Sequence, residues 1–325
     1  MSKPKVLFVL PIHEEAMQLM AEEAEVIMAE STEEDYLAEK VVDVDAIMVR
    51  GVVPITAKII NAAKKCKVIG RHGVGCDNID VAQATAAGIP VIYCPGANTN
   101  SVAEHTASLM LAVAKQVRSS DEALRRDGNY DCRLKIQTVE LREKTLGLVG
   151  LGNIGRTFAS ICQHGFGMNI IAYDPYVNME TVQAAGLAVK LTDSLEELLQ
   201  AADFVSLHAP AMPETYKMIG KRELQLMKKT AFLINAARGS LVDENALFAA
   251  LTEGEIAGAG LDVFDPEPPA ADNPLYTLPN VVVTPHTAAN GDQALRNMAF
   301  MAVKGTLQVL KGERPANVFN PEVWQ

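Results

Sequence analysis

The sequence lacks any CxxC pair among its five scattered cysteines, Cys66, Cys76, Cys94, Cys132 and Cys162. An odd number of dispersed cysteines indicates neither a disulfide framework nor a zinc site, so no metal is expected and a reducing cytoplasm fits best. The sequence also lacks an apolar run near the roughly 20 residues that span a bilayer. The short apolar run at 6–10 is followed at once by polar residues at 13–15, which predicts a first strand rather than a signal peptide.

Basic residues are in the minority. The 325 residues include 29 Lys and Arg against 40 Asp and Glu, which gives a net charge of -11. Such a balance disfavours binding to nucleic acid, where cations must neutralise phosphates. Apolar residues make up 49% and charged residues 21%, which is ordinary for a globular protein and excludes extended disorder. A chain of this length favours two domains over one.

Short apolar runs alternate with helical patterns along the whole chain. The N-terminal part contains strand candidates at 6–10, 25–28, 46–49, 68–70 and 89–93. Six more follow at 145–149, 169–173, 204–208, 231–235, 258–263 and 281–284. We expect helices that start near Ser31 or Thr32, at Thr56, at 78–87, from Ser101 toward Arg118, and at 293–310.

Strands that alternate with helices predict parallel, doubly wound sheets. The fold expected is α/β with two such domains, one flavodoxin-like and one Rossmann domain. If the last helix packs on the first sheet, the first domain is discontinuous. We therefore expect residues 1–98 plus 290–325 to form a substrate-binding domain and residues 99–289 to form a cofactor-binding domain.

A glycine-rich turn joins the strand predicted at 145–149 to a helical pattern. Gly150, Gly152 and Gly155 form a GxGxxG, in which the glycines permit a tight turn, a close approach to pyrophosphate and close helix packing. Asp174 follows about 20 residues later, at the end of the next strand, where a carboxylate can bind the adenosine ribose. No Lys or Arg occurs from Pro175 to Glu180 to neutralise a 2'-phosphate, so NAD is favoured over NADP.

Three polar segments follow the ends of later predicted strands, where ligands bind in open α/β sheets. They supply Arg238 within 235–239, Glu267 within 261–268, and His286 within 284–287. Each residue also has an ordinary structural interpretation, as a surface cation, a loop acid or a residue that starts a helix.

These motifs together resemble the D-2-hydroxyacid dehydrogenase family, particularly its phosphoglycerate dehydrogenase branch. The resemblance extends over nearly the whole chain and includes the segments 70–80, 95–98, 101–105, 147–155, 235–239, 262–268 and 285–286. It implies that Arg238 orients the substrate, that Glu267 is the acidic partner of the histidine, and that His286 is the acid/base.

The residue types suit this chemistry. Hydride loss from C2 of a hydroxy acid requires loss of the hydroxyl proton, and an imidazole such as that of His286 titrates nearest to neutral pH. A carboxylate on the imidazole, from Glu267, would fix its orientation and stabilise its protonated form. The planar guanidinium of Arg238 can hold the substrate carboxylate.

The resemblance further implies which residues contact the cofactor. Besides Gly150, Gly152, Gly155 and Asp174, they are Asn153, Ile154, His208, Ala209, Pro210, Ala236 and Asp262. The other histidines, including His105 in the helix that starts near Ser101, are interpreted as packing or structural residues.

An anionic substrate is expected from a second set of residues. Backbone N–H groups of Val74 and Gly75 could bind a carboxylate, and the resemblance adds Asn98. Arg50 aligns with an arginine that contacts substrate in phosphoglycerate dehydrogenases, whereas Val52 stands where some members carry a second arginine. Fewer cations would bind a phosphate dianion less well.

Three functions remain open at this stage. The first is an NAD-dependent, phosphoglycerate dehydrogenase-like enzyme. The second is a hydroxypyruvate or glyoxylate reductase, or another dehydrogenase of unphosphorylated 2-hydroxy acids. The third is a non-enzymatic, NAD-sensing corepressor, which the presence of all three catalytic residues disfavours. The resemblance suggests a homodimer, and no regulatory domain is expected in a chain that ends at Gln325.

Overall fold

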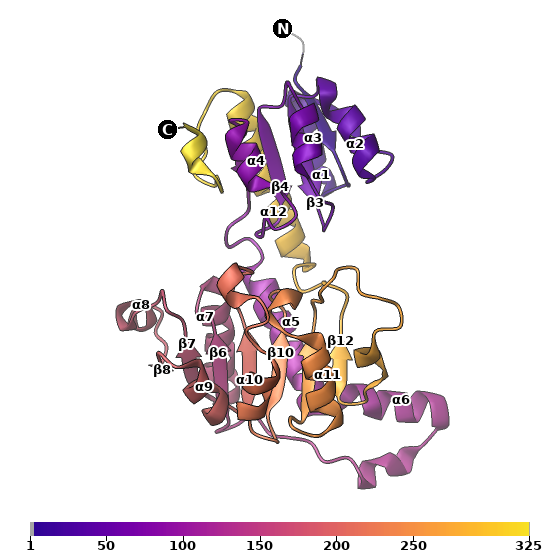
Figure 1. Ribbon diagram of the computed structural model, residues 1–325, viewed down its shortest axis with the longest axis vertical. Coiled ribbons are helices and arrows are strands. Elements are labelled where there is room, and N and C mark those ends of the chain that lie inside the picture. Colours follow the sequence, from indigo (N-terminus) through magenta and orange to yellow (C-terminus); the bar gives the residue numbers. More distant parts are fainter. Residues whose placement is uncertain (1–2, 325) are drawn as a thin grey trace. The chain divides into compact units, whose positions relative to one another are not determined.

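The computed structural model describes residues 3–324 and divides the chain into two compact units. The smaller unit combines Met1–Asn98 with Asn290–Gln325, and the larger unit is Thr99–Ala289. Each contains one parallel sheet with helices against it (Figure 1). The α/β fold expected from the sequence, with two parallel-sheet units, is confirmed. Within residues 3–324, no helix combines the length and the apolar character that crossing a lipid bilayer requires.

The smaller unit contains a five-stranded sheet in the order β2-β1-β3-β4-β5. Its strands are β1 (Lys5–Phe8), β2 (Glu25–Met28), β3 (Ala46–Arg50), β4 (Val68–His72) and β5 (Val91–Ile92). Its helices are α1 (Glu14–Glu23), α2 (Glu34–Lys40), α3 (Ala57–Ala62), α4 (Val81–Ala86) and α12 (Asp292–Leu310). Thr306 of α12 is buried against Met48 of β3, so the last helix completes the core that the first residues begin.

The larger unit contains a seven-stranded sheet in the order β12-β11-β10-β9-β6-β7-β8. Its strands are β6 (Thr145–Val149), β7 (Asn169–Tyr173), β8 (Val189–Leu191), β9 (Phe204–Leu207), β10 (Phe232–Asn235), β11 (Gly258–Leu261) and β12 (Val281–Val283). Its helices are α5 (Thr99–Ala114), α6 (Val117–Asp127), α7 (Asn153–Ser160), α8 (Met179–Ala184), α9 (Leu195–Ala201), α10 (Lys221–Leu226) and α11 (Glu244–Thr252).

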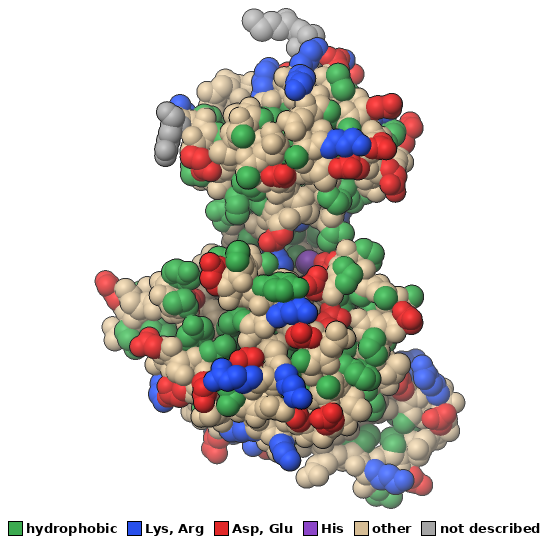
Figure 2. Space-filling model, viewed as in Figure 1, with side chains coloured by type: hydrophobic (Ala, Val, Ile, Leu, Met, Phe, Trp, Pro, Cys, Tyr) green, Lys and Arg blue, Asp and Glu red, His purple; other side chains and the backbone are tan. Residues whose placement is uncertain are grey.

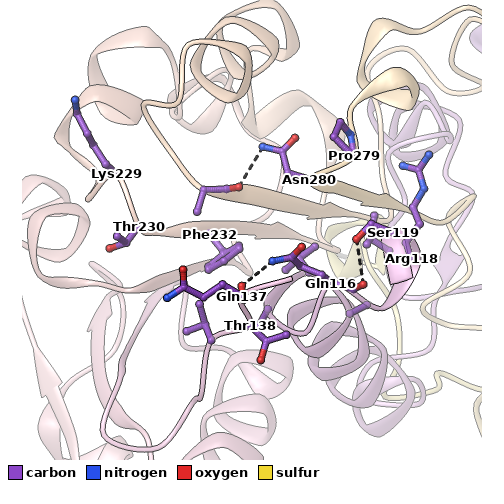
Figure 3. Close-up of a pocket in the computed structure, with 16 residues that line it drawn as sticks. Gln116, Arg118, Ser119, Gln137, Thr138, Lys229, Thr230, Phe232, Pro279 and Asn280 are labelled. Carbon is purple, nitrogen blue, oxygen red and sulfur yellow. Dashed lines mark hydrogen bonds between the residues drawn. The ribbon is translucent and has the colours of Figure 1, made fainter. Parts of the chain in front are cut away.

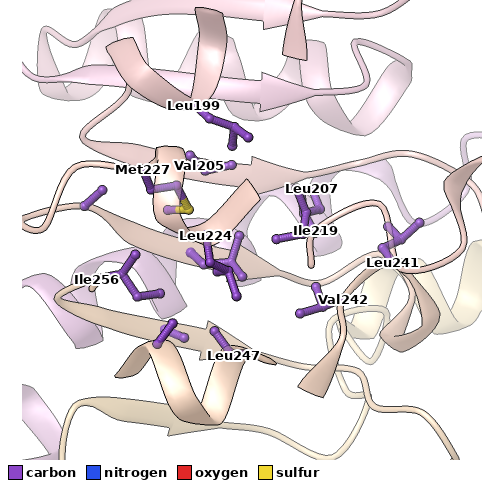
Figure 4. Packing of buried hydrophobic residues seen from close by; sticks show 14 of the residues in the cluster. Leu199, Val205, Leu207, Ile219, Leu224, Met227, Leu241, Val242, Leu247 and Ile256 are labelled. Carbon is purple, nitrogen blue, oxygen red and sulfur yellow. The ribbon is translucent and has the colours of Figure 1, made fainter. Parts of the chain in front are cut away.

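Aliphatic strands explain the parallel sheet of the larger unit. β9 and β10 are buried along their whole length, as expected for strands covered on both faces. Leu207, Leu224 and Leu247 belong to a large apolar cluster on one side of this sheet (Figure 4). The carboxyl ends of the central strands are thereby fixed, and the polar segments that follow them start from a rigid base.

Several expected elements differ from the structure. Counting six strands in the larger unit was wrong, because the short edge strand β8 was missed; it has three residues and too few apolar positions for a clear pattern. The helix expected from Ser101 toward Arg118 ends at Ala114, since Gln116 adopts a left-handed conformation with φ 51°. The helix expected at Ser31 or Thr32 begins at Glu34.

Candidate active site

The glycine turn connects β6 to α7. Gly150 has φ 95°, and a Cβ added to it would lie 2.8 Å from the backbone carbonyl of His208, so only glycine fits. A Cβ added to Gly152 would meet nothing within 4 Å, and Gly152 directly precedes α7. The backbone beside the helix N-terminus is therefore open to an anion, which fits the pyrophosphate of a dinucleotide. Asn153 and Ile154 begin the helix at this point.

Asp174 links the glycine turn to the end of β7. Its Oδ2 accepts a hydrogen bond of 2.7 Å from the backbone N–H of Leu151, and its Oδ1 accepts one of 2.9 Å from that of Tyr176. Each carboxylate oxygen retains a lone pair for a ribose hydroxyl. The residue thus fits a ribose acceptor and holds the phosphate-binding turn in place.

His208 follows β9 and is held by a fully buried hydroxyl. Its Nε2 lies 3.0 Å from Ser206 Oγ, and its ring packs against Phe158. Burial lowers the pKa of His208 to about 4, so the ring is neutral near pH 7. A neutral ring beside the glycine turn suits a cofactor-lining role. The cofactor contacts expected for His208, Ala209 and Pro210 stay predictions.

The segment after β10 carries Arg238. Buried Asn235 accepts a hydrogen bond from Ala237 N–H (3.1 Å) and donates one to the Arg238 carbonyl (2.9 Å), which closes a tight loop over Ala236. Arg238 Nη1 donates to the Ala237 carbonyl at 2.7 Å. The side chain of buried Asn235 therefore fixes the loop that carries Arg238.

Gly239 brings the arginine segment against the segment that contains Glu267. A Cβ added at Gly239 would lie 2.0 Å from the carbonyl carbon and oxygen of Phe264, so the two backbones touch. Phe264 N–H in turn donates to Glu267 Oε1 at 3.0 Å. Arg238 and Glu267 are consequently carried by two loops in direct backbone contact.

Glu267 and His286 form an ion-pair geometry. Glu267 Oε2 lies 2.7 Å from His286 Nδ1, and the histidine side chain is 42% exposed. With Nδ1 engaged by the carboxylate, Nε2 is the ring nitrogen that can exchange a proton with a substrate. The structure thus brings together two of the three residues predicted as catalytic and connects the third to them through Gly239.

Asp262 lies under the loop that carries His286. Its carboxylate is fully buried; Oδ1 accepts from Thr287 N–H and Oδ2 from Ala288 N–H, both at 2.9 Å. Its backbone carbonyl accepts from His286 N–H at 2.7 Å. In this structure Asp262 therefore braces the histidine loop, and the cofactor contact expected from the sequence stays a prediction.

The residues expected to recognise substrate lie in the smaller unit. Arg50, at the end of β3, donates from Nη1 to the Pro11 carbonyl at 2.6 Å. Arg71 donates from Nη1 to the Gly51 carbonyl (2.7 Å) and from Nε to the Gly75 carbonyl (3.0 Å). Arg71 thus ties together the loops after β3 and β4, including Val74 and Gly75. Asn98 ends the first segment of this unit.

A cavity of about 510 Å³ occurs elsewhere in the larger unit (Figure 3). Gln116, Gln137, Thr138, Phe232 and Asn280 are among its lining residues, and Gln116 Nε2 donates to the Gln137 carbonyl at 2.7 Å. Phe232 begins β10 and Asn280 precedes β12, so this cavity lies at the amino ends of the strands of the larger unit, at the opposite edge of that sheet from Arg238 and His286.

Two polar residues of this site were missed by the sequence analysis. Thr284 donates from Oγ1 to Asp262 Oδ1 at 2.5 Å, and His105 Nε2 lies 2.9 Å from Thr284 Oγ1. The interpretation of His105 as a packing residue was therefore incomplete. Its position in α5 is distant in sequence from the motif of His286, and only the fold brings them together. Among the described residues, no cluster of His, Cys, Asp and Glu is arranged to hold a metal ion.

Comparison with known proteins agrees with this geometry. Residues 107–288 match the NAD-binding domain of the D-isomer specific 2-hydroxyacid dehydrogenases. The chain is 45% identical to D-3-phosphoglycerate dehydrogenase of Methanocaldococcus jannaschii, over 97% of this chain and 59% of that protein. It is 38% identical to glyoxylate reductase of Korarchaeum cryptofilum, over 99% of this chain and 97% of that protein.

A solved structure has the same architecture. The TT0316 protein from Thermus thermophilus superposes with a TM-score of 0.88 at 36% identity, covering 97% of this chain and 99% of that chain. The present chain spans about three-fifths of the length of the phosphoglycerate dehydrogenases that it matches. The matched domain, the glycine turn and the paired Glu267 and His286 lead to one conclusion: the chain belongs to the D-isomer specific 2-hydroxyacid dehydrogenase family.

Proposed function

We propose that this protein is an NAD-dependent dehydrogenase that acts on C2 of a small 2-hydroxy acid or the corresponding 2-keto acid. The observation that carries the proposal is the contact of 2.7 Å between His286 and Glu267, in the same unit as the glycine turn. An imidazole paired with a carboxylate is suited to accept and return a proton near neutral pH.

Each residue has one task in the reduction of a keto acid. Bound NADH supplies the hydride that adds to C2. His286 donates the proton from Nε2 to the C2 oxygen, so that one hydride and one proton convert the carbonyl to a hydroxyl. Glu267 holds the imidazole by Nδ1 and fixes which ring nitrogen faces the substrate. Arg238 orients the substrate carboxylate, and oxidation follows the same path in reverse.

The decisive experiment is NADH oxidation, followed by absorbance, with a panel of 2-keto acids. We expect turnover with at least one small keto acid and greatly reduced turnover in the His286→Asn variant. Absence of turnover with every keto acid, in a protein that still binds NADH, would favour the non-enzymatic, NAD-sensing alternative.

We propose a small anionic substrate, with a phosphoglycerate dehydrogenase-like reaction as the first candidate. The identity to phosphoglycerate dehydrogenases supports it, as does the guanidinium of Arg50 at the edge of the smaller unit. The second candidate is an unphosphorylated acid such as glyoxylate or hydroxypyruvate. It is favoured by Val52 and by the commitment of Arg71 to the carbonyls of Gly51 and Gly75.

We further propose a homodimer formed through the segment of α6 and the short 3₁₀ helix Tyr130–Leu134. No residue of α6 is buried, and the helix extends away from the sheet of its own unit (Figure 1). Val117, Leu124, Tyr130 and Leu134 expose 53%, 50%, 67% and 72% of their surface. A short helix with no buried residue is marginal in water, and exposed apolar side chains of this kind favour association.

A second copy of the chain is the proposed occupant of this surface. Apolar and charged side chains alternate over the face in Figure 2, so the projection is not a uniformly charged surface. The cavity beside Gln116 and Gln137 adjoins the base of the projection and could receive a side chain of the partner.

Light scattering tests the dimer. We expect Leu134→Glu together with Leu124→Glu to shift the protein to a monomer, and Met179→Glu, at an exposed apolar residue elsewhere, to leave the mass unchanged. A monomeric wild-type protein would contradict the proposal. We also propose a cytoplasmic location, which suits five cysteines that form no disulfide framework and of which four are buried.

A further inference from the structure

The side chain of His105 reaches the carboxyl end of the larger sheet from α5. Leu109 lies four residues later on the same helix, and a Cβ added to Gly260 of β11 would lie only 3.0 Å from the Leu109 Cβ. α5 therefore packs closely on β11, the strand that precedes Asp262. His105 is one helical turn nearer to the helix N-terminus and leaves 21% of its side chain exposed.

A chain of hydrogen bonds with a defined direction begins at His105. The hydroxyl of Thr284 has one proton, and Oγ1 lies 2.5 Å from Asp262 Oδ1, a carboxylate oxygen that can only accept. The contact of 2.9 Å between His105 Nε2 and Thr284 Oγ1 must then be donated by the imidazole. His105 Nε2 is also 3.3 Å from Asp262 Oδ1, so one N–H serves both oxygens.

The chain ends on the loop of His286. Asp262 accepts hydrogen bonds from three consecutive backbone N–H groups. Its carbonyl accepts from residue 286, and its two carboxylate oxygens accept from residues 287 and 288. These three hydrogen bonds hold His286 at φ 53°, a left-handed conformation that a non-glycine residue rarely adopts. Burial alone would raise the pKa of Asp262, but hydrogen bonds from His105, Thr284 and the loop lower it below its usual value.

We propose that His105 is a positioning residue for the proposed dehydrogenase, which acts through Thr284 and Asp262 to fix the loop that holds His286 against Glu267. The juxtaposition of these three side chains with the strained loop carries the inference. His105 does not exchange a proton with substrate. It orients the Thr284 hydroxyl toward Asp262 and completes the shell of donors that a buried carboxylate requires.

The test compares three variants of the 325-residue protein. His105→Leu removes the donor; His105→Gln keeps an N–H donor on a side chain of similar reach; Thr106→Val removes a buried hydroxyl of the same helix that bonds only to Val102 in its own helix. We expect His105→Leu to lower kcat by roughly 10- to 100-fold, as a misplaced acid/base does, with unchanged NADH affinity. His105→Gln should recover most of the loss, and Thr106→Val should keep kcat.

Amide hydrogen exchange gives a readout that does not depend on activity. In His105→Leu without ligands, the amides of Thr287 and Ala288 should exchange at least about tenfold faster, whereas amides of β9 should be unchanged. If wild type reduces no keto acid but the exchange changes as expected, the proposed function fails and the positioning role stands. Unchanged exchange, a kcat equal to wild type in His105→Leu, or a His105→Gln variant as slow as His105→Leu would overturn the inference.

Discussion

The two units end their central strands in different ways. In the larger unit, the neighbouring strands β9, β10 and β11 carry the buried polar residues Ser206, Asn235 and Asp262 within, at or just after their carboxyl ends. Each contacts a residue of the segment that follows its strand. In the smaller unit, Arg50 bonds to the carbonyl of Pro11, after β1, and Arg71 ties the loops after β3 and β4 through the carbonyls of Gly51 and Gly75. Buried polar side chains that bond to a loop restrict it to one conformation, whereas long cationic side chains near the surface can change their conformation.

The difference suggests a division of labour. Proton transfer requires a group held within a fraction of an ångström, which the fully buried carboxylate of Asp262 provides for His286. Recognition of an anion requires positive charge and tolerates several geometries, and in the proposed function the guanidinium of Arg50 would supply that charge. Four variants test this difference, in order of decreasing expected effect.

The largest effect is expected from His286→Asn in the braced unit. An acid/base group contributes about 10²- to 10⁴-fold to the rate, so kcat should fall by that factor. NADH affinity, measured by fluorescence, should stay within about twofold, because the glycine turn is untouched. Glu267→Gln should lose less, since an amide still contacts Nδ1. Unchanged turnover in His286→Asn would remove this residue from the mechanism.

Arg50→Ala addresses the cationic unit. We expect kcat/KM to fall about tenfold more for 3-phosphohydroxypyruvate than for hydroxypyruvate, since a dianion loses more from the missing guanidinium. Arg71→Ala is the matched control: it should lower the melting temperature by releasing Gly51 and Gly75, and affect both substrates equally. Equal losses on both substrates in Arg50→Ala would mean that Arg50 does not read the distal group.

Asp174→Ala should alter the choice of cofactor by a similar factor. Removal of the carboxylate takes away the ribose acceptor and the repulsion of a 2'-phosphate, so the ratio of kcat/KM for NAD over NADP should fall by roughly tenfold. Because Asp174 also bonds Leu151 N–H in the glycine turn, some affinity for both cofactors should be lost. A wild-type enzyme that uses NADP as well as NAD would contradict the assignment.

The smallest effect is expected on stability in acid. Burial, together with the charge of Arg50, lowers the pKa of His72 from 6.5 to about 4, although its bond to the Leu295 carbonyl opposes the shift. The unfolded chain then binds more protons than the native one between pH 6.5 and 4, so stability falls as the pH is lowered through this window. His72→Gln should reduce this loss, by roughly 5 °C in the melting temperature at about pH 4.5. Melting temperatures that fall equally with decreasing pH in wild type and His72→Gln would contradict this prediction.

Local sequence patterns were sufficient for much of this structure. The glycine turn after an apolar strand, the acid about 20 residues later and the polar segments after strands made Gly150, Asp174, Glu267 and His286 candidates, because each belongs to a local pattern in the sequence. Parallel sheets followed from strands that alternate with helices. The family and the fold predicted from these patterns are confirmed.

Features that depend on long-range packing were not predictable. His105 and Thr284 are separated by 179 residues and meet only once α5 lies on β11. The edge strand β8 is too short to show an alternation of apolar and polar residues. The break between α5 and α6 depends on the left-handed conformation of Gln116, which its residue type does not predict. The brace role of Asp262 likewise depends on its burial, which a motif does not report.

The discontinuous smaller unit has a consequence for biosynthesis. β1 to β5 are synthesised before the larger unit, but α12, which packs on β3 and β4 through Thr306, is made only after it. At roughly 5–20 residues per second the interval is about 10 to 40 seconds, during which the larger unit can fold while the earlier sheet has an uncovered apolar face. Nascent chains stalled before residue 290 should thus be the species that chaperones bind most strongly.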